Sequence, residues 1–268
     1  MRIALCQLPV SSDPGVNLGR VREALGTAAD GGAELAVFPE ATLTRFGSDL
    51  RAAAAEPLDG PFCAGLAGAA RETGVALVAG VFEPAGDGRV YNTAVVIGGD
   101  GALVAAYRKL HLFDAFTQRE SDLVAPGAEV VVAEVGGVLV GVQICYDIRF
   151  PELTRALAVG GASLVTVSAA WQAGLFKEEH WVTLLRARAI ENTVWVAAAG
   201  QVPDPDEKPT RAPTGVGRSM LIDPLGVVRA DLGPTAGVTV VDADMSLVET
   251  VRKTLPSLAN RRADVFGG

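Results

Sequence analysis

The chain has 268 residues, of which 49% are hydrophobic, and its formal net charge at pH 7 is -8. Such an acidic chain lacks the clustered Lys and Arg that nucleic-acid phosphates require, so we expect no nucleic-acid partner. Its three cysteines are widely spaced without a CxxC pair, and with only two histidines available we expect no metal site and a reducing, cytoplasmic setting.

The first half alternates strand-like and helix-like segments. The opening segment, residues 2–7, could be read as a signal sequence, but Gln7 and Pro9 interrupt its apolar run, and its alternation favours a first strand. The segment 13–32 predicts a helix with Asp13 as its cap and Pro14 at its first position. Further along, the pattern predicts strands at 34–38, 75–82, 90–97 and 102–107, and a helix at 62–74.

The second half repeats this mixture. We expect strands at 129–135, 138–144, 163–168, 194–200 and 215–222, two more strands after a turn at 223–226, and helices at 151–159, 178–193 and 246–255. No apolar run reaches the length of a membrane span, so we expect no membrane partner. The length suits one domain over residues 1–268, and the mixture of helix-linked and turn-linked strands predicts an α/β fold with mixed sheets packed face to face.

Four polar or aromatic side chains lie just past the end of a predicted strand. Glu40, Lys109, Cys145 and Trp171 each follow an apolar run. Ligand crevices in open α/β sheets form at the carboxyl ends of strands, so we expect these four side chains to meet although they are distant in sequence.

A nucleophilic cysteine needs a neighbouring base or cation because a thiol with a pKa near 8.5 is mostly protonated at neutral pH. Glu40 is a candidate base, and Lys109 is a candidate cation that would also stabilise the oxyanion formed when Cys145 adds to a carbonyl carbon. The backbone N–H of Tyr146 is a candidate second oxyanion donor.

Other interpretations of these residues stay open. Free cysteines are usually inert core residues, and we interpret Cys6 and Cys63 in that way. His111 or His180 could instead partner Cys145, as in papain-like enzymes, although His180 at a helix start is also typical of the edge of a core. No dinucleotide or phosphate-loop motif is present, so we expect no nucleotide cofactor.

Three segments carry a family resemblance. "AVFPE" with Glu40, "YRKLHLFD" with Lys109 and "GVQICYDIRFPE" with Cys145, in this order, resemble the signature segments of the nitrilase superfamily of carbon-nitrogen hydrolases. The similarity runs from the opening "RIALCQLPV" to the closing "LPSLANRRADVF" and so covers essentially the whole chain.

The resemblance implies a Glu-Lys-Cys catalytic set on an α-β-β-α sandwich of four layers with pseudo-two-fold internal symmetry, usually paired as a homodimer. Glu40 would be the general base, Lys109 would stabilise the tetrahedral intermediate and Cys145 would form a thioester. A second glutamate often found in the family corresponds to Glu120, which would support Lys109 or the attacking water.

Within the superfamily, "HLFD", "ESDLVAPG" and "CYDIRFPEL" look most similar to the omega-amidase and deaminated-glutathione amidase branch, whose substrates are small amides that bear a carboxylate. Arg149 is the first candidate for binding that carboxylate, with Arg211 and Arg218 behind it. A local salt bridge from Arg149 to Asp147 or Glu152 is an equally good interpretation.

Trp171 and His111 are further candidates for substrate contact, although an aromatic residue at Trp171 could simply pack. The loop 201–213 resembles the family least, which leaves substrate size and charge open. Alternative activities are hydrolysis of N-carbamoyl compounds or of nitriles. A protein that uses a reactive thiol for redox sensing or binding, without turnover, is the alternative outside enzymes.

Overall fold

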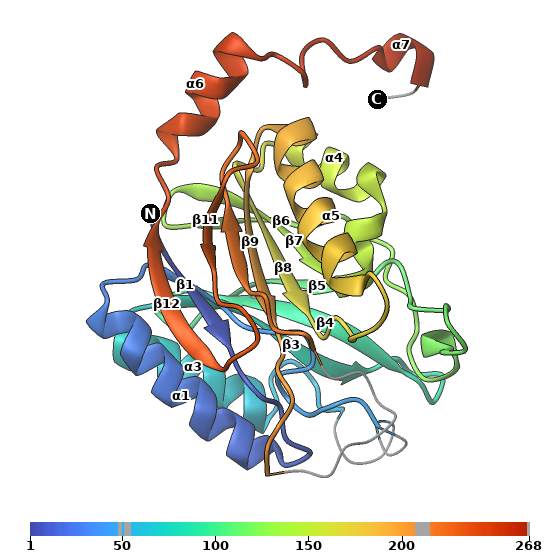
Figure 1. The fold of residues 1–268 in the computed structure, drawn as a ribbon. Coiled ribbons are helices and arrows are strands. Elements are labelled where there is room, and N and C mark those ends of the chain that lie inside the picture. The colour runs from blue at the N-terminus through green and yellow to red at the C-terminus, as the bar shows by residue number, and fades with distance from the viewer. Residues whose placement is uncertain (48–49, 51–54, 207–214, 267–268) are drawn as a thin grey trace.

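Two six-stranded sheets packed face to face form the body of the protein (Figure 1). The computed structural model describes residues 1–47, 50, 55–206 and 215–266. One helix pair covers the outer face of the first sheet and a second pair covers the outer face of the second sheet. These helices are α1 (Pro14–Asp30) and α3 (Pro61–Thr73), then α4 (Pro151–Val159) and α5 (Lys177–Asn192). The expected α-β-β-α sandwich of four layers is confirmed.

The two sheets repeat one topology. In strand order, the first sheet contains β12 (Gly237–Asp242), β1 (Arg2–Gln7), β2 (Leu35–Val37), β3 (Ala76–Pro84), β4 (Val90–Ile97) and β5 (Leu103–Arg108). The second sheet contains β6 (Val132–Val135), β7 (Val138–Ile144), β8 (Leu164–Ala169), β9 (Trp195–Gly200), β10 (Met220–Ile222) and β11 (Val228–Asp231). In each, three parallel strands linked by helices are flanked by antiparallel strands, so the pseudo-two-fold symmetry is present in the connections.

Local chemistry explains the helix starts. The Asp13 carboxylate accepts hydrogen bonds from Gly15 N at 2.7 Å and Val16 N at 3.3 Å, and Pro14 opens α1 where a backbone N–H would have no partner. In the same way Pro151 opens α4 directly after the turn that carries Cys145. Both predicted helix starts are confirmed.

The core lies mainly between the sheets. The buried side chains there are almost all aliphatic, and burying each Val, Leu or Ile side chain contributes about 1.5–3 kcal/mol. A second apolar cluster lies between the first sheet and the α1 and α3 helices. Because three buried parallel strands of each sheet end at the same edge, this packing fixes the positions of the loops that follow them.

Two predicted strands are shorter than expected. The strand predicted at 129–135 begins at Val132, and the strand predicted at 215–222 begins at Met220. At the second, Gly217 and Arg218 have φ values of 72° and 53°, a left-handed conformation that is incompatible with strand pairing. Gly215 instead forms an isolated bridge with Gln172.

The C-terminal segment leaves the body through α6 (Ser246–Thr254) and ends with α7 (Ala263–Phe266), as Figure 1 shows. Two short 3-10 turns, η1 (Glu120–Asp122) and η2 (Cys145–Arg149), lie in loops near the site described below. In the ranges that the structure describes, no helix is both long and apolar enough to cross a membrane.

Candidate active site

Glu40 lies in a turn just beyond β2 that packs tightly on β3. A Cβ atom at Gly80 would lie 2.3 Å from the backbone nitrogen of Ala41, so only glycine lets the two backbones approach this closely. Ala41 itself has a φ of 57°. From the second half of the chain, the Gln201 side chain donates a hydrogen bond to the Glu40 carbonyl at 2.6 Å. The Glu40 turn is therefore held from both sheets.

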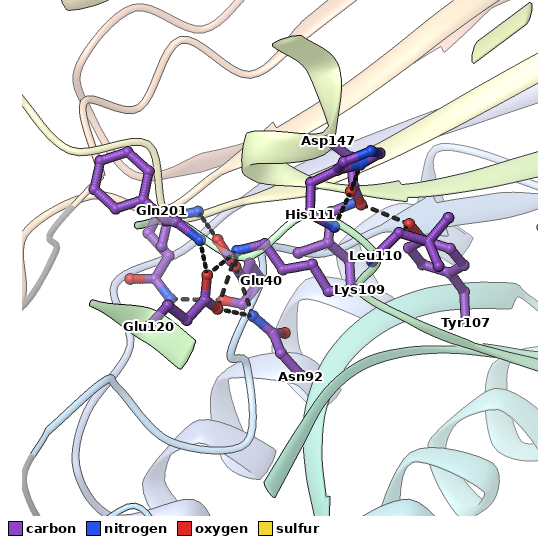
Figure 2. Close-up of polar contacts among 12 residues, drawn as sticks. Glu40, Asn92, Tyr107, Lys109, Leu110, His111, Glu120, Asp147 and Gln201 are labelled. Atoms are coloured by element: carbon purple, nitrogen blue, oxygen red, sulfur yellow. Dashed lines mark hydrogen bonds and ion pairs between the residues drawn. The ribbon is translucent and has the colours of Figure 1, made fainter. Parts of the chain in front are cut away.

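Lys109, the first residue after β5, lies between two carboxylates (Figure 2). Its Nζ donates to Glu40 Oε1 at 2.9 Å and to both oxygens of Glu120 at 3.1 and 2.9 Å. The Asn92 amide donates to Glu40 Oε1 at 2.8 Å and to Glu120 Oε1 at 3.1 Å, and the Ala170 N–H donates to Glu40 Oε2 at 2.8 Å. Glu40, Lys109 and Glu120 each therefore have several hydrogen-bond partners, as buried charges require.

Electrostatics keep Lys109 charged. Glu40 and Lys109 have only 1% and 2% of their surface exposed. Burial alone would lower the pKa of Lys109, but the carboxylates of Glu120 and Glu40 outweigh it and hold that pKa well above its ordinary value. Lys109 therefore carries a fixed positive charge at any pH at which the protein works.

Cys145 follows the last residue of β7 and begins the η2 turn. Its φ is 45°, a left-handed conformation that costs a residue with a side chain about 1–3 kcal/mol and that recurs at functional sites. Burial raises the pKa of its thiol well above the usual value, and the Glu40 carboxylate raises it further while Lys109 opposes them. The resting thiol is therefore protonated and lies beside a carboxylate able to accept its proton.

Asp147 ties the Lys109 segment to the Cys145 turn. Its fully buried carboxylate accepts hydrogen bonds from Tyr107 Oη at 2.7 Å, Ile144 N at 3.0 Å and His111 N at 3.0 Å, and lies 2.8 Å from His111 Nδ1 (Figure 2). The His111 ring also stacks on Phe150 with centroids 3.7 Å apart. The strand end that carries Lys109 and the turn that carries Cys145 are fixed to one another through this single side chain.

A cavity of about 280 Å³ opens onto these residues, a size suited to a small molecule. Glu40, Lys109, Cys145, Glu120, Tyr146, Arg149 and Trp171, all predicted as site residues, line it. The predicted contact residue His111 does not line it, and neither does His180, which leaves Cys145 without a histidine in the cavity wall. Among the described residues no group of His, Cys, Asp and Glu is arranged to hold a metal ion.

The candidate carboxylate-binding arginines differ in their surroundings. The Arg149 guanidinium lies over the Trp171 ring at 4.7 Å, and in the described part of the chain it forms no salt bridge to Asp147 or Glu152. Arg218 forms ion pairs with Asp231 and Glu178 and lies outside the cavity wall. Arg211 lies outside the described residues, as does the rest of the loop 201–213 from residue 207 onward.

Sequence reasoning missed four residues of the site. Asn92 is an amide within the mostly apolar β4, and Asp147 was considered only as a salt-bridge partner of Arg149. Gln201 begins the loop that resembled the family least, and Lys177 is a single lysine after "GLF". An amide inside a buried strand was the one available signal, because a buried polar side chain needs partners.

Comparison with known proteins gives a consistent result. A family model described as Carbon-nitrogen hydrolase matches residues 2–253. Hydrolase Rv0480c of Mycobacterium tuberculosis is 46% identical, covering 97% of this chain and 95% of its own, and the Deaminated glutathione amidase of Escherichia coli O157:H7 is 36% identical, covering 98% and 97%. An amidase from Nesterenkonia sp. AN1 is 30% identical with a TM-score of 0.84, covering 99% and 98%; this structure, of a glutamate-to-glutamine mutant, shows acrylamide added to the active-site cysteine.

Proposed function

We propose that this chain, which belongs to the carbon-nitrogen hydrolase family of the nitrilase superfamily, hydrolyses the amide of a small carboxylate-bearing substrate through a thioester on Cys145. That it is an enzyme acting on amides follows from the family and its amidase relatives. The observation that supports the residue roles is the contact of one buried ammonium, Lys109 Nζ, with both Glu40 and Glu120 beside the Cys145 thiol.

In the first half of the reaction, Glu40 accepts the thiol proton as Cys145 adds to the amide carbon. Negative charge then develops on the amide oxygen, where the Lys109 ammonium and the Tyr146 backbone N–H stabilise it. Losing one such donor typically costs about 3 kcal/mol of transition-state stabilisation. Glu40 returns the proton to the leaving nitrogen, ammonia departs and an acyl thioester remains on Cys145.

In the second half, the Glu40 carboxylate, free of its proton again, takes one from a water molecule that attacks the thioester carbon. The same oxyanion donors act, and the collapse of the second tetrahedral intermediate releases the acid product and returns the proton to the sulfur. Glu120 and Asn92 take no proton in this scheme; they hold Lys109 and Glu40 in place.

The substrate class rests on Arg149 and on the named relatives. Arg149 lines the cavity without a carboxylate partner among the described residues, so its charge is available to a substrate carboxylate. Relatives include the Deaminated glutathione amidase of E. coli O157:H7 and the Omega-amidase NIT2 of Danio rerio, which is 35% identical. A monoamide of a small dicarboxylic acid has both an amide to hydrolyse and a carboxylate for Arg149 to bind.

Trapping the thioester tests the scheme. Wild-type protein quenched during turnover should carry the acyl group of the substrate on Cys145 by intact and peptide mass spectrometry, and Cys145→Ala should carry none and release no ammonia. Glu40→Gln should lower kcat by about 10²- to 10⁴-fold, the usual contribution of general acid-base catalysis. Ammonia release by Cys145→Ala would overturn the assignment. Labelling of Cys145 without ammonia release from any amide would instead support a non-catalytic reactive thiol.

Two further expectations accompany this function. The resemblance implies a homodimer, which sedimentation velocity would test, and the cysteine pattern favours the cytoplasm, which fractionation of the source cells would test.

A further inference from the structure

A second lysine, Lys177, faces the cavity, and no carboxylate of the described residues pairs with it. It is the first residue of α5, lines the cavity and has only 8% of its surface exposed. Its Nζ lies 4.9 Å from the ring centroid of Phe113 and 4.7 Å from that of Phe116. Within the described ranges no carboxylate or other hydrogen-bond acceptor binds this ammonium. A buried charge without a counter-charge is expensive, so its presence requires an explanation.

Packing explains the backbone of Lys177 but not its charge. Its carbonyl accepts a hydrogen bond from Trp171 Nε1 at 2.8 Å, which any residue could provide. Its aliphatic stem fills space that a methionine would fill equally well. Among the described residues the ammonium itself contacts the two phenylalanine rings but no hydrogen-bond acceptor.

The ring faces hold the cation without neutralising it. A cation is attracted to the face of an aromatic ring, but the ring carries no net charge, so the field of the ammonium still reaches the cavity. The pKa of Lys177 is lowered, first by burial and then by the neighbouring Arg149 charge, with Cys145 acting against both. An anion bound beside Lys177 would oppose this lowering of its pKa.

Arg149 is a second cation of the cavity wall that lies over aromatic rings. Its guanidinium lies 4.7 Å from the Trp171 centroid and 5.9 Å from that of Tyr146, and its one polar side-chain contact among the described residues is His180 Nδ1 at 3.4 Å. Lys109 is neutralised by its two carboxylates, whereas Lys177 and Arg149 form no ion pair with any residue that the structure describes. In a chain with a net charge of -8, these two cations make part of the cavity positive.

We propose that Lys177 binds the carboxylate of the substrate and is a residue that determines the preference of the enzyme for anionic over neutral amides, with Arg149 acting beside it. The inference rests on the proposed function and deepens it, because it names the residue that selects monoamides of dicarboxylic acids. The favoured substrate carries its carboxylate at the end remote from the scissile amide.

The test compares glutaramate with pentanamide, a neutral amide of the same chain length, in Lys177→Met, Lys177→Arg and wild-type protein. Hydrogen bonds between charged groups are stronger than neutral ones, so the ratio of kcat/KM for glutaramate to that for pentanamide should fall about 10- to 100-fold in Lys177→Met, mainly through KM. Lys177→Arg should retain most of the ratio. Lys253→Met is the matched control because Lys253 is exposed on α6 beside Glu249.

A binding measurement separates this inference from the proposed function. Glutaramate is titrated calorimetrically into Cys145→Ala protein and into the same protein carrying Lys177→Met. Weaker binding in the second protein supports the carboxylate site even if no amide is turned over, whereas equal or absent binding in both overturns it. An unchanged kcat/KM ratio in Lys177→Met also overturns the inference and leaves the hydrolysis intact. Failure of wild-type protein to release ammonia from either amide counts against the proposed function alone.

Discussion

Replacing Asp147 with asparagine should destabilise the protein by about 3–5 kcal/mol. In the native protein Asp147 Oδ1 accepts from His111 N, and Oδ2 accepts from Ile144 N and Tyr107 Oη. Asparagine keeps one oxygen and presents an NH2 group in place of the other, so in either orientation one buried backbone N–H, that of His111 or Ile144, faces a donor. That orphaned donor costs about 1–3 kcal/mol, and the surviving hydrogen bonds lose their charge assistance, about 1 kcal/mol each.

The effect is measured by thermal denaturation followed by circular dichroism. At roughly 2 °C per kcal/mol for a chain of this size, Tm should fall by roughly 6–10 °C. Asp87→Asn is the matched control, because Asp87 pairs with Arg89 at an exposed site where such pairs contribute little to stability.

Activity should fall with the loss of this contact even where the variant is folded. Asp147 fixes the Lys109 strand end relative to the Cys145 turn, and a displacement near 1 Å in a catalytic group can cost on the order of 100-fold in rate. We expect kcat in Asp147→Asn to be about 10- to 100-fold below wild type at a temperature well under its Tm. An Asp147→Asn protein that melts and turns over like Asp87→Asn would refute this reasoning.

Two other predictions concern the Glu40 turn and the thiol. Gly80→Ala places a Cβ 2.3 Å from the Ala41 nitrogen, so it should lower both Tm and kcat. The control is Gly19→Ala in α1, whose Cβ meets nothing within 4 Å and should raise stability by about 0.5–1 kcal/mol. Equal kcat in the two variants would contradict this prediction. Because the pKa of Cys145 is raised by burial and by Glu40, alkylation by iodoacetamide should accelerate as pH rises above neutral, and Glu40→Gln should move that rise to lower pH. Rates from intact mass across the pH range check this, and a shift to higher pH would count against it.

The sequence predicted the catalytic candidates better than their supports. Glu40, Lys109 and Cys145 each follow an apolar run whose pattern predicted a strand, and strand ends at one sheet edge meet, so their convergence followed from local patterns. The supports Asn92 and Asp147 depend on which face of a strand or turn points inward, and that is decided by packing between the two sheets.

Lys177 illustrates a different limit. A lysine at the start of a helix usually lies in solvent, and nothing in "GLFKEEHW" indicates that Phe113 and Phe116, some sixty residues earlier, will enclose it. The left-handed residues Gly217 and Arg218 likewise shortened a strand that the apolar pattern predicted to be longer.

The repeated topology divides the proposed reaction between two parts of the chain. Glu40 and Lys109 belong to the first repeat, and Cys145 opens the turn after the first strand of the second repeat's parallel set. During synthesis the proposed base and cation therefore leave the ribosome before the proposed nucleophile, and a fragment that ends before β7 lacks the Cys145 thiol. The thiol acquires its proton acceptor only when both sheets have docked. If these roles hold, amide hydrolysis is a property of the two docked sheets, and its appearance during refolding would time their docking.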